Sequence, residues 1–250
     1  MGRIIAVANQ KGGIGKTTTA VALAAGLSKK GFKTLLIDTD SQCNATDTYQ
    51  AETEETATIV DLLFEQEPAI NCIQKTEAGH IIASDPLMQN AETKFPNDPS
   101  KPYLLKKACA NLTDIYDYII IDTPPTIGSI LSNVLTYAHE VIIPVTCDRY
   151  GLVGLDLLNR SMESTREFTN PDLKILGLLM IKHSDRLNLN KSVMDGLEQV
   201  AKNLNTKIFN SKIRESVACR ESQVARKSIY DYAPNSTTTK DYESLCDEII

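Results

Sequence analysis

Five short runs of hydrophobic residues alternate along the chain with longer stretches in which apolar residues recur at helical spacing. The runs are nearly continuous in Ile, Leu and Val, and they cover residues 3–9, 33–40, 116–125, 140–146 and 173–182. A strand that is buried on both faces requires such a run. Strands that alternate with helices favour the α/β class, with a doubly wound, mostly parallel sheet and helices on both faces.

The stretches between these runs predict helices over residues 17–31, 150–168 and 190–204. Gly31 is placed to end the first of them. The apolar stripe predicted for that first helix consists of Ala20, Val21, Ala24 and Leu27. Residues 50–112 give the weakest pattern of the chain, so we assign no regular element there.

Three prolines in residues 95–102 predict a loop. We find no repeat, linker or low-complexity tail, and therefore expect a single domain over residues 1–250. The six cysteines are scattered without a C-x-x-C, and the three histidines form no H-E-x-x-H. Zinc and disulfide frameworks are thus disfavoured, and reduced thiols in the cytosol are expected. The chain shows neither a signal peptide nor an apolar run of about 20 residues, the length of a membrane span.

The segment ANQKGGIGKTTTA, residues 8–20, has the pattern of a phosphate-binding loop between a strand and a helix. Its glycines let backbone N–H groups turn inward around phosphate oxygens, and the N-terminus of the following helix adds positive potential. Lys16 is expected to reach the β and γ phosphates, Thr17 to bind Mg²⁺ through its hydroxyl, and Thr18 to donate to the α phosphate. The predicted nucleotide-binding residues are Lys11, Gly12, Gly13, Ile14, Gly15, Lys16, Thr17 and Thr18.

Two positions in this loop depart from the usual pattern G-x-x-x-x-G-K-[ST]: Gln10 replaces the first glycine, and Lys11 adds a second cation. A second ammonium beside Lys16 would meet like-charge repulsion within one chain. We hypothesise that the nucleotide lies between two copies of the protein, and that Lys11 stabilises charge on the phosphates held by the other copy. The alternative is an exposed loop lysine.

Carboxylates follow two of the predicted strands. Asp38 and Asp40 end the second run in the order I-D-T-D, and alternate strand residues point the same way, so both can face one site. Asp122 ends the buried run YIIID, where an acid beside a phosphate loop commonly holds Mg²⁺. Burial of this acid without a cation would be costly. Asp38 and Asp40 could instead cap a helix or a turn.

KGGIGKTTTA resembles the deviant Walker A motif of the ParA/MinD family of P-loop ATPases, in which the early lysine acts across an ATP-sandwich dimer. The likeness continues through LLIDTDSQCNAT, YDYIIIDTPP, VIIPVTCDRYGLVGL and YAPNSTTTKDYESLCDEI, in the family's order over most of the chain. Within the family the chain most resembles ParA-type DNA partition ATPases. The resemblance implies a P-loop NTPase fold, a homodimer in the ATP state, and slow hydrolysis stimulated by a ParB-like centromere-binding protein.

The same resemblance assigns roles to site residues. The position of Asp40 orients or activates the attacking water, so the predicted catalytic residues are Lys11, Lys16 and Asp40. The predicted metal site is Thr17, Asp38 and Asp122. Where the family usually reads D-P-Q-G-N, this chain has Ser41 for proline and Cys43 for glycine. Because cysteine disfavours a left-handed conformation, we expect an altered loop geometry.

A local excess of basic residues could bind DNA although the whole chain carries a net charge of −6. Residues 174–227 hold eleven bases and five acids, a balance of +6. ParA dimers bind nonspecific DNA through lysine and arginine contacts to backbone phosphates. The candidate DNA contacts are Arg186, Arg214 and Arg220, and the alternative is a solvated surface. We expect no helix-turn-helix extension before the first strand.

ATP with Mg²⁺ is expected rather than GTP, because no N-K-x-D guanine motif occurs. Adenine contacts are expected from the ends of residues 178–182 and 209–216. A MinD-like membrane switch needs a basic amphipathic C-terminal helix, whereas residues 241–250 contain four acids and no base. A nitrogenase-reductase-like protein would need paired cysteines for a metal cluster, and a tyrosine-kinase relative would carry a tyrosine-rich tail. The sequence suggests neither feature. A metabolite-phosphorylating P-loop enzyme and a ParA-like protein that positions a non-DNA cargo stay open. The leading hypothesis is a cytoplasmic, nucleoid-associated partition ATPase that does not bind membranes.

Overall fold

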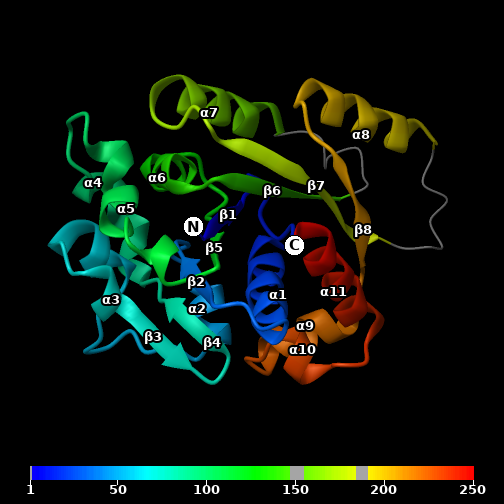
Figure 1. Cartoon of the computed structure of the whole chain (residues 1–250), viewed down its shortest axis with the longest axis horizontal. Coiled ribbons are helices and arrows are strands. Elements are labelled where there is room, and N and C mark those ends of the chain that lie inside the picture. Colours follow the sequence, from blue (N-terminus) through cyan, green and yellow to red (C-terminus); the bar gives the residue numbers. More distant parts are fainter. Residues whose placement is uncertain (1, 147–154, 184–190) are drawn as a thin grey trace.

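The computed structural model describes residues 2–146, 155–183 and 191–250, which form one eight-stranded sheet in the order β3-β4-β2-β5-β1-β6-β7-β8 (Figure 1). β1 lies between β5 and β6, and all neighbouring strands except one pair are parallel. The exception is the antiparallel pair β3–β4 at one edge. The predicted fold class, a mostly parallel α/β sheet, is confirmed.

All five predicted strands are present. They are β1 (Arg3–Val7), β2 (Thr34–Asp38), β5 (Tyr118–Asp122), β6 (Glu140–Thr146) and β7 (Lys174–His183). Every residue of β2 and β5 is buried, as expected for central strands covered on both faces.

Three strands escaped the sequence pattern: β3 (Ile73–Thr76), β4 (Gly79–Ile82) and β8 (Ile208–Arg214). β3 and β4 have four residues each and form a hairpin within the segment to which no element was assigned. β8 is an edge strand in which buried positions are interrupted by exposed Asn210 and Lys212. Short or half-buried strands lack the continuous apolar run that marks a central strand.

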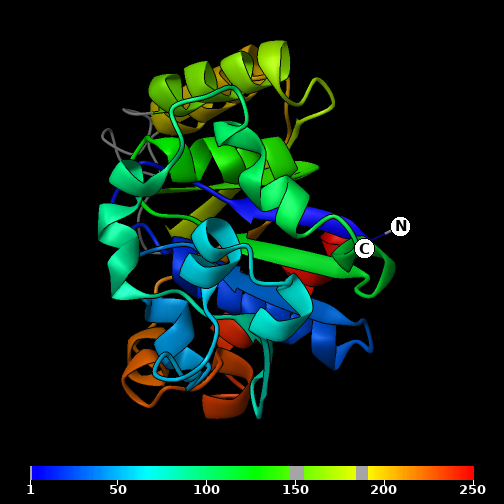
Figure 2. The same cartoon turned by 90° about the vertical axis from the view of Figure 1, so that its left-hand side faces the viewer.

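Helices cover both faces of the sheet (Figures 1 and 2). One face carries α1 (Lys16–Lys29), α2 (Asn44–Thr48), α9 (Val217–Val224), α10 (Ile229–Tyr232) and α11 (Thr237–Ile249). The other carries α3 (Ala69–Cys72), α4 (Ala91–Lys94), α5 (Leu104–Ala108), α6 (Ser129–Tyr137), α7 (Leu155–Phe168) and α8 (Lys191–Asn203). Single turns of π- or 3₁₀-helix span Asp61–Glu65, Pro86–Asn90, Lys101–Tyr103 and Leu112–Asp114. No helix in these described ranges is long and apolar enough to cross a bilayer.

α1 is more deeply buried than the predicted single stripe. Residues 19–27 are all buried, because α10 and α11 cover the side of α1 that the sheet leaves open. The Thr19 hydroxyl lies 3.3 Å from the Tyr242 hydroxyl of α11. Gly31 ends the helix as predicted, with φ of 92°, a conformation that favours glycine.

The parallel strands bring three chemical segments to one edge of the sheet. The phosphate loop follows β1, Asp38 ends β2, and Asp122 ends β5. In the sheet register, Asp122 lies opposite Val7 on one side and opposite Asp38 on the other. Carboxyl ends of parallel strands are the usual place for a ligand in such folds.

Candidate active site

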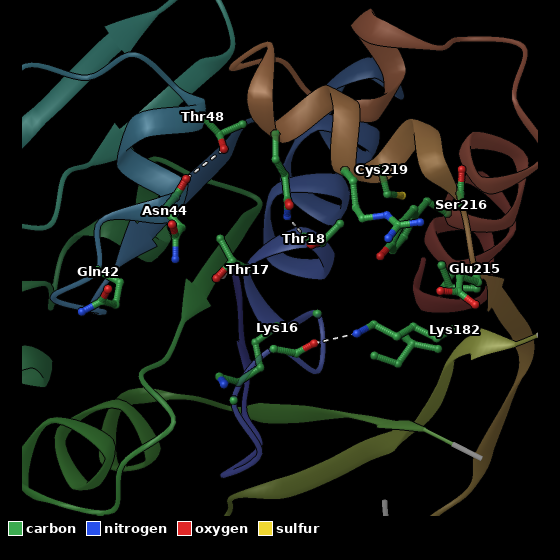
Figure 3. Close-up of a pocket in the computed structure, with 18 of the residues that line it drawn as sticks. Lys16, Thr17, Thr18, Gln42, Asn44, Thr48, Lys182, Glu215, Ser216 and Cys219 are labelled. Atoms are coloured by element: carbon green, nitrogen blue, oxygen red, sulfur yellow. Dashed lines mark hydrogen bonds between the residues drawn. The ribbon is translucent and has the colours of Figure 1, made fainter. Parts of the chain in front are cut away.

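A cavity of about 580 Å³ opens at this edge of the sheet (Figure 3). Its walls are the phosphate loop, the start of α1, the loop after β2 with α2, the ends of β7 and β8, and one side of α9. The predicted nucleotide-binding loop therefore forms part of the wall of this cavity. This volume is within the usual range for pockets that hold a small ligand.

The phosphate loop has the backbone that its glycines allow. Gly13 and Gly15 have φ of 65° and 93°, and α1 begins directly after Gly15. Gly12 and Gly13 are exposed to the cavity, whereas Ile14 is buried in the core beneath it. Ile14 can therefore contribute to nucleotide binding through its backbone only, while its side chain anchors the loop.

Lys16 lies inside the cavity with a side chain that is almost fully buried. Its ammonium is 3.4 Å from the carbonyl oxygen of Lys11. Burial lowers the pKa of Lys16, whereas the nearby carboxylates of Asp122 and Asp40 raise it. A buried cation at the foot of a loop of inward N–H groups fits a bound phosphate chain.

Lys11 is held away from this cavity. Its backbone N–H donates to the Asn9 side chain at 2.9 Å, and Asn9 in turn donates to the carbonyl of Pro144 at 2.7 Å. The Lys11 ammonium donates to the Thr146 hydroxyl at 3.2 Å, at the end of β6. Lys11 does not belong to the described residues that line the cavity, so the two lysines of the loop face different places.

Asp122 is fully buried at the end of β5, near Thr17 and Lys16, and neither of its carboxylate oxygens accepts a well-aligned hydrogen bond from the described residues. Burial raises its pKa well above the usual range, and Asp38 and Asp40 add to this. The nearby Thr17 hydroxyl and Lys16 ammonium lower the pKa but do not reverse the shift. Without a cation such a buried acid is driven toward its neutral form, whereas a bound cation would stabilise the carboxylate.

Thr17 and Asp122 fit Mg²⁺, which takes hard oxygen ligands and commonly uses one carboxylate, a hydroxyl and substrate phosphates. The described residues contain no group of three His, Cys, Asp or Glu that could hold a metal ion. A Mg²⁺ ion bound there would neutralise negative charge on the phosphates.

Asp38 lies opposite Asp122 in the sheet, and both of its carboxylate oxygens already accept hydrogen bonds. One oxygen accepts from the Asp40 N–H at 3.1 Å, and the other from the Thr46 N–H and hydroxyl at 2.9 and 2.8 Å. Burial raises its pKa to about 6. These contacts tie β2 to the following loop and to α2. The predicted contribution of Asp38 to the metal site stays a prediction.

Asp40 lines the cavity opposite the phosphate loop. Its carboxylate accepts from the Gln42 N–H at 3.0 Å, and its carbonyl accepts from the Cys43 N–H at 2.9 Å in a tight turn. One carboxylate oxygen is thereby oriented by the turn. The predicted role of Asp40 toward an attacking water stays a prediction, and its position in the cavity is compatible with it.

Cys43 contradicts one expectation. The sequence suggested that cysteine would keep this loop out of the left-handed conformation, yet Cys43 has φ of 54° and ψ of 28°. The hydrogen bonds to Asp38 and Asp40 on one side, and from the Asp47 N–H to the Cys43 carbonyl on the other, impose the turn. The loop therefore keeps the shape that glycine would give it, at a conformational cost.

Replacing Cys43 by glycine is expected to stabilise the nucleotide-free protein by about 0.5–1 kcal/mol, the left-handed penalty less the entropy that glycine loses on folding. Urea unfolding measures this. The matched control is Cys43→Ala, which removes the thiol but keeps the backbone penalty and should give no such gain. Equal stability of the glycine and alanine variants would refute the strain at this position.

The far end of the cavity is formed by residues from β7, β8 and α9. Ile181 and Lys182 come from one segment predicted to contact adenine, and 213–216 from the other. α9 was not anticipated, because neither Cys219 nor Gln223 belongs to a recognisable motif. The Gln223 amide donates to the Thr18 hydroxyl at 2.8 Å, which leaves the Thr18 proton able to point at a phosphate (Figure 3).

The candidate DNA contacts fare differently. Arg214 pairs with Asp241 of α11 through two side-chain hydrogen bonds of 3.0 and 2.5 Å and lies at the cavity wall. Arg220 is exposed on α9 and also lines the cavity, and Arg186 lies outside the described residues. The charge of +6 counted for residues 174–227 leaves out acids from other segments. Three bases of this segment form ion pairs with such acids: Arg214 with Asp241, Lys207 with Glu248, and Arg226 with Asp47.

Comparison with known proteins agrees with this geometry. A family profile described as an AAA domain matches residues 2–175. The chain is 34% identical to the chromosome partitioning protein ParA of Myxococcus xanthus, over 100% of this chain and 88% of that protein. It is 36% identical to the sporulation initiation inhibitor protein Soj of Bacillus subtilis, over 100% and 98%.

Solved structures give the same result. A putative plasmid partition protein from Borrelia burgdorferi, bound to AMPPNP, is 26% identical with a TM-score of 0.82, covering 100% of this chain and 98% of that one. Cobyrinic acid a,c-diamide synthase from Mycobacterium smegmatis, with ADP and magnesium, is 28% identical with a TM-score of 0.84, covering 99% and 93%. Both are similar over nearly their whole length, and their ligands agree with the expected ATP and Mg²⁺. The chain belongs to the ParA-type family of ATP-hydrolysing P-loop proteins, as its loop motifs predicted.

Proposed function

We propose that this protein is an ATP-dependent dimerising switch for plasmid or chromosome partition. The observation that supports it most is the separation of the two loop lysines. Lys16 lies in the cavity, whereas Lys11 is directed to Thr146, outside the described lining of its own cavity. We infer from this direction of its side chain that Lys11 serves a nucleotide held by a second copy.

In this proposal the chain's own residues divide the work. Thr17 and Asp122 hold Mg²⁺, while Lys16 and the N–H groups of residues 12–15 hold the phosphates of ATP. Asp40 orients the attacking water, and the second subunit contributes the ammonium of its Lys11 to the phosphates. Losing the γ phosphate removes the contacts that favour the dimer, so hydrolysis releases it.

The dimer is proposed to bind nonspecific DNA in the cytoplasm, on the nucleoid, and to be released when a ParB-like partner stimulates hydrolysis. Exposed Arg220 on α9 is the described candidate that best supports a DNA contact. The ion pairs of Arg214, Lys207 and Arg226 reduce the local positive charge. That reduction is the reason to keep a ParA-like positioning of a non-DNA cargo as the second candidate.

A MinD-like membrane switch has less support. The apolar residues of α11 are buried against α1 and β8, including Leu245 and Ile249. A membrane-binding helix needs its apolar face available to lipid.

Light scattering of the Asp40→Ala variant tests the proposal, because blocked hydrolysis should preserve the ATP state. We expect a monomer with ADP and a dimer with ATP and magnesium. Only the ATP sample should bind duplex DNA, with log affinity falling by about 0.9 per log unit of salt for each phosphate neutralised. A monomer in saturating ATP would overturn the proposal, and a dimer without DNA binding would favour the non-DNA cargo.

A further inference from the structure

Lys182 lies at the end of β7 in an unusual backbone conformation. Its φ is 52°, in the left-handed region that lysine rarely adopts. The pairing of β7 with β8 also shifts register between Met180 and His183. The strand therefore departs from regular geometry at the residue that turns toward the cavity. Such outliers persist where the surrounding structure imposes them, and they gather at functional sites.

The side chain of Lys182 reaches the phosphate loop. Its ammonium donates to the carbonyl oxygen of Gly13 at 2.8 Å, linking positions 169 residues apart (Figure 3). Lys182 also lines the cavity, while its side chain is otherwise exposed. The interaction thus joins the wall of the cavity to the tip of the loop.

The tip of the loop has little packing of its own. A Cβ atom added at Gly12 or at Gly13 would meet no atom within 4 Å. N–H groups that turn inward to phosphate require neighbouring carbonyls to turn outward, since both belong to the same peptide planes. A cation that holds the Gly13 carbonyl at the cavity wall fixes the direction of that carbonyl before any ligand arrives.

We propose that Lys182 is a positioning residue that presets the phosphate loop of this chain for a polyphosphate, in addition to the two lysines of the loop itself. The proposal rests on the cavity being the nucleotide site. Lys182 is expected to raise the affinity for the phosphate chain, because a loop that is already ordered loses less conformational entropy when the ligand binds. Lys182 does not touch the reacting atoms, so the rate of the chemical step should be unaffected.

Lys182→Met keeps the aliphatic stem and removes the donor. We expect it to weaken binding of Mg-ADP about tenfold, in the range for one lost charge-assisted hydrogen bond, and to raise KM for ATP similarly with unchanged kcat. Lys182→Arg should restore most of the affinity. The matched control is Lys75→Met, which removes an exposed lysine from β3 at the other edge of the sheet. Titration calorimetry and steady-state kinetics measure these effects.

Lys182→Gly separates positioning from stability. Glycine relieves the left-handed backbone and removes the ammonium, so the nucleotide-free protein should melt at the same or a higher temperature while Mg-ADP binding falls as in Lys182→Met. Wild-type affinity in both variants would overturn the positioning role, as would a loss of kcat without a change in KM. A wild-type protein that binds ADP but never dimerises would refute the partition switch and leave this inference standing.

Discussion

Replacing Lys11 by alanine is expected to lower kcat for ATP hydrolysis by about 1000-fold, the lower range for a cationic finger supplied in trans. Binding of ATP to the monomer should change little, because the Lys11 ammonium contacts Thr146 and does not line its own cavity. Charge that builds up on the phosphates would lose a cation in the transition state only. Single-turnover hydrolysis and equilibrium binding of a fluorescent ATP analogue separate the two effects.

Mixing two inactive variants tests whether Lys11 acts across the dimer. In a heterodimer of Lys11→Ala with Asp40→Ala, one site combines an intact Asp40 with an intact Lys11 from the other subunit. Random pairing should restore about one quarter of wild-type activity, since half the dimers are mixed and each has one complete site. No recovery on mixing would place Lys11 in its own site and contradict the trans arrangement.

Replacing Asp122 by asparagine is expected to stabilise the nucleotide-free protein by about 1–3 kcal/mol at neutral pH, the cost of an unsatisfied buried polar or charged group. The folded pKa of Asp122 is raised, so ionisation opposes folding and the penalty is fully present above that pKa. The gain should therefore shrink as pH falls toward the unfolded value, about 3.9. Urea unfolding of both proteins at pH values from about 4.5 to about 8 measures this difference in free energy of unfolding.

The same variant should lose the tightening of nucleotide binding by magnesium, because the carboxylate proposed to face the ion is gone. Asp195→Asn, at an exposed position of α8, makes the same charge change away from the cavity and should alter neither property. A destabilised Asp122→Asn protein whose ADP affinity still responds to magnesium would show that Asp122 has another partner and that the ion is held elsewhere.

The five strands predicted correctly share one property: burial on both faces gives each of them a nearly continuous apolar run. β2 and β5 are fully buried and read as continuous apolar runs. The hairpin β3–β4 is short, and β8 is an edge strand with alternating exposure, so their patterns resemble those of loops. α1 looked one-sided because alanine and threonine pack well without being strongly apolar.

For the candidate site too, some features could be predicted from the sequence and others could not. The meeting of the phosphate loop with Asp38 and Asp122 could be predicted, since parallel strands bring their carboxyl ends to one edge. Contacts between segments far apart in the chain could not be predicted, because no local pattern shows that Gln223 or Lys182 reaches the phosphate loop and the start of α1. Summing charges over a contiguous segment likewise missed partners such as Asp241, which the fold brings from another helix.

The pairing of Arg214 with Asp241 has a practical consequence for any ionic-strength experiment. Asp241 lies on the helix that contributes Tyr242 to the cavity, and its carboxylate also accepts the backbone N–H of Arg214, so this pair stabilises the cavity wall. Mobile ions weaken exposed pairs more than sheltered ones, and the arginine here is half exposed. Concentrated electrolyte is thus expected to weaken retention of a nucleotide as well as the proposed binding of a polyanion. A salt titration of the proposed polyanion binding therefore needs a parallel measurement of nucleotide affinity.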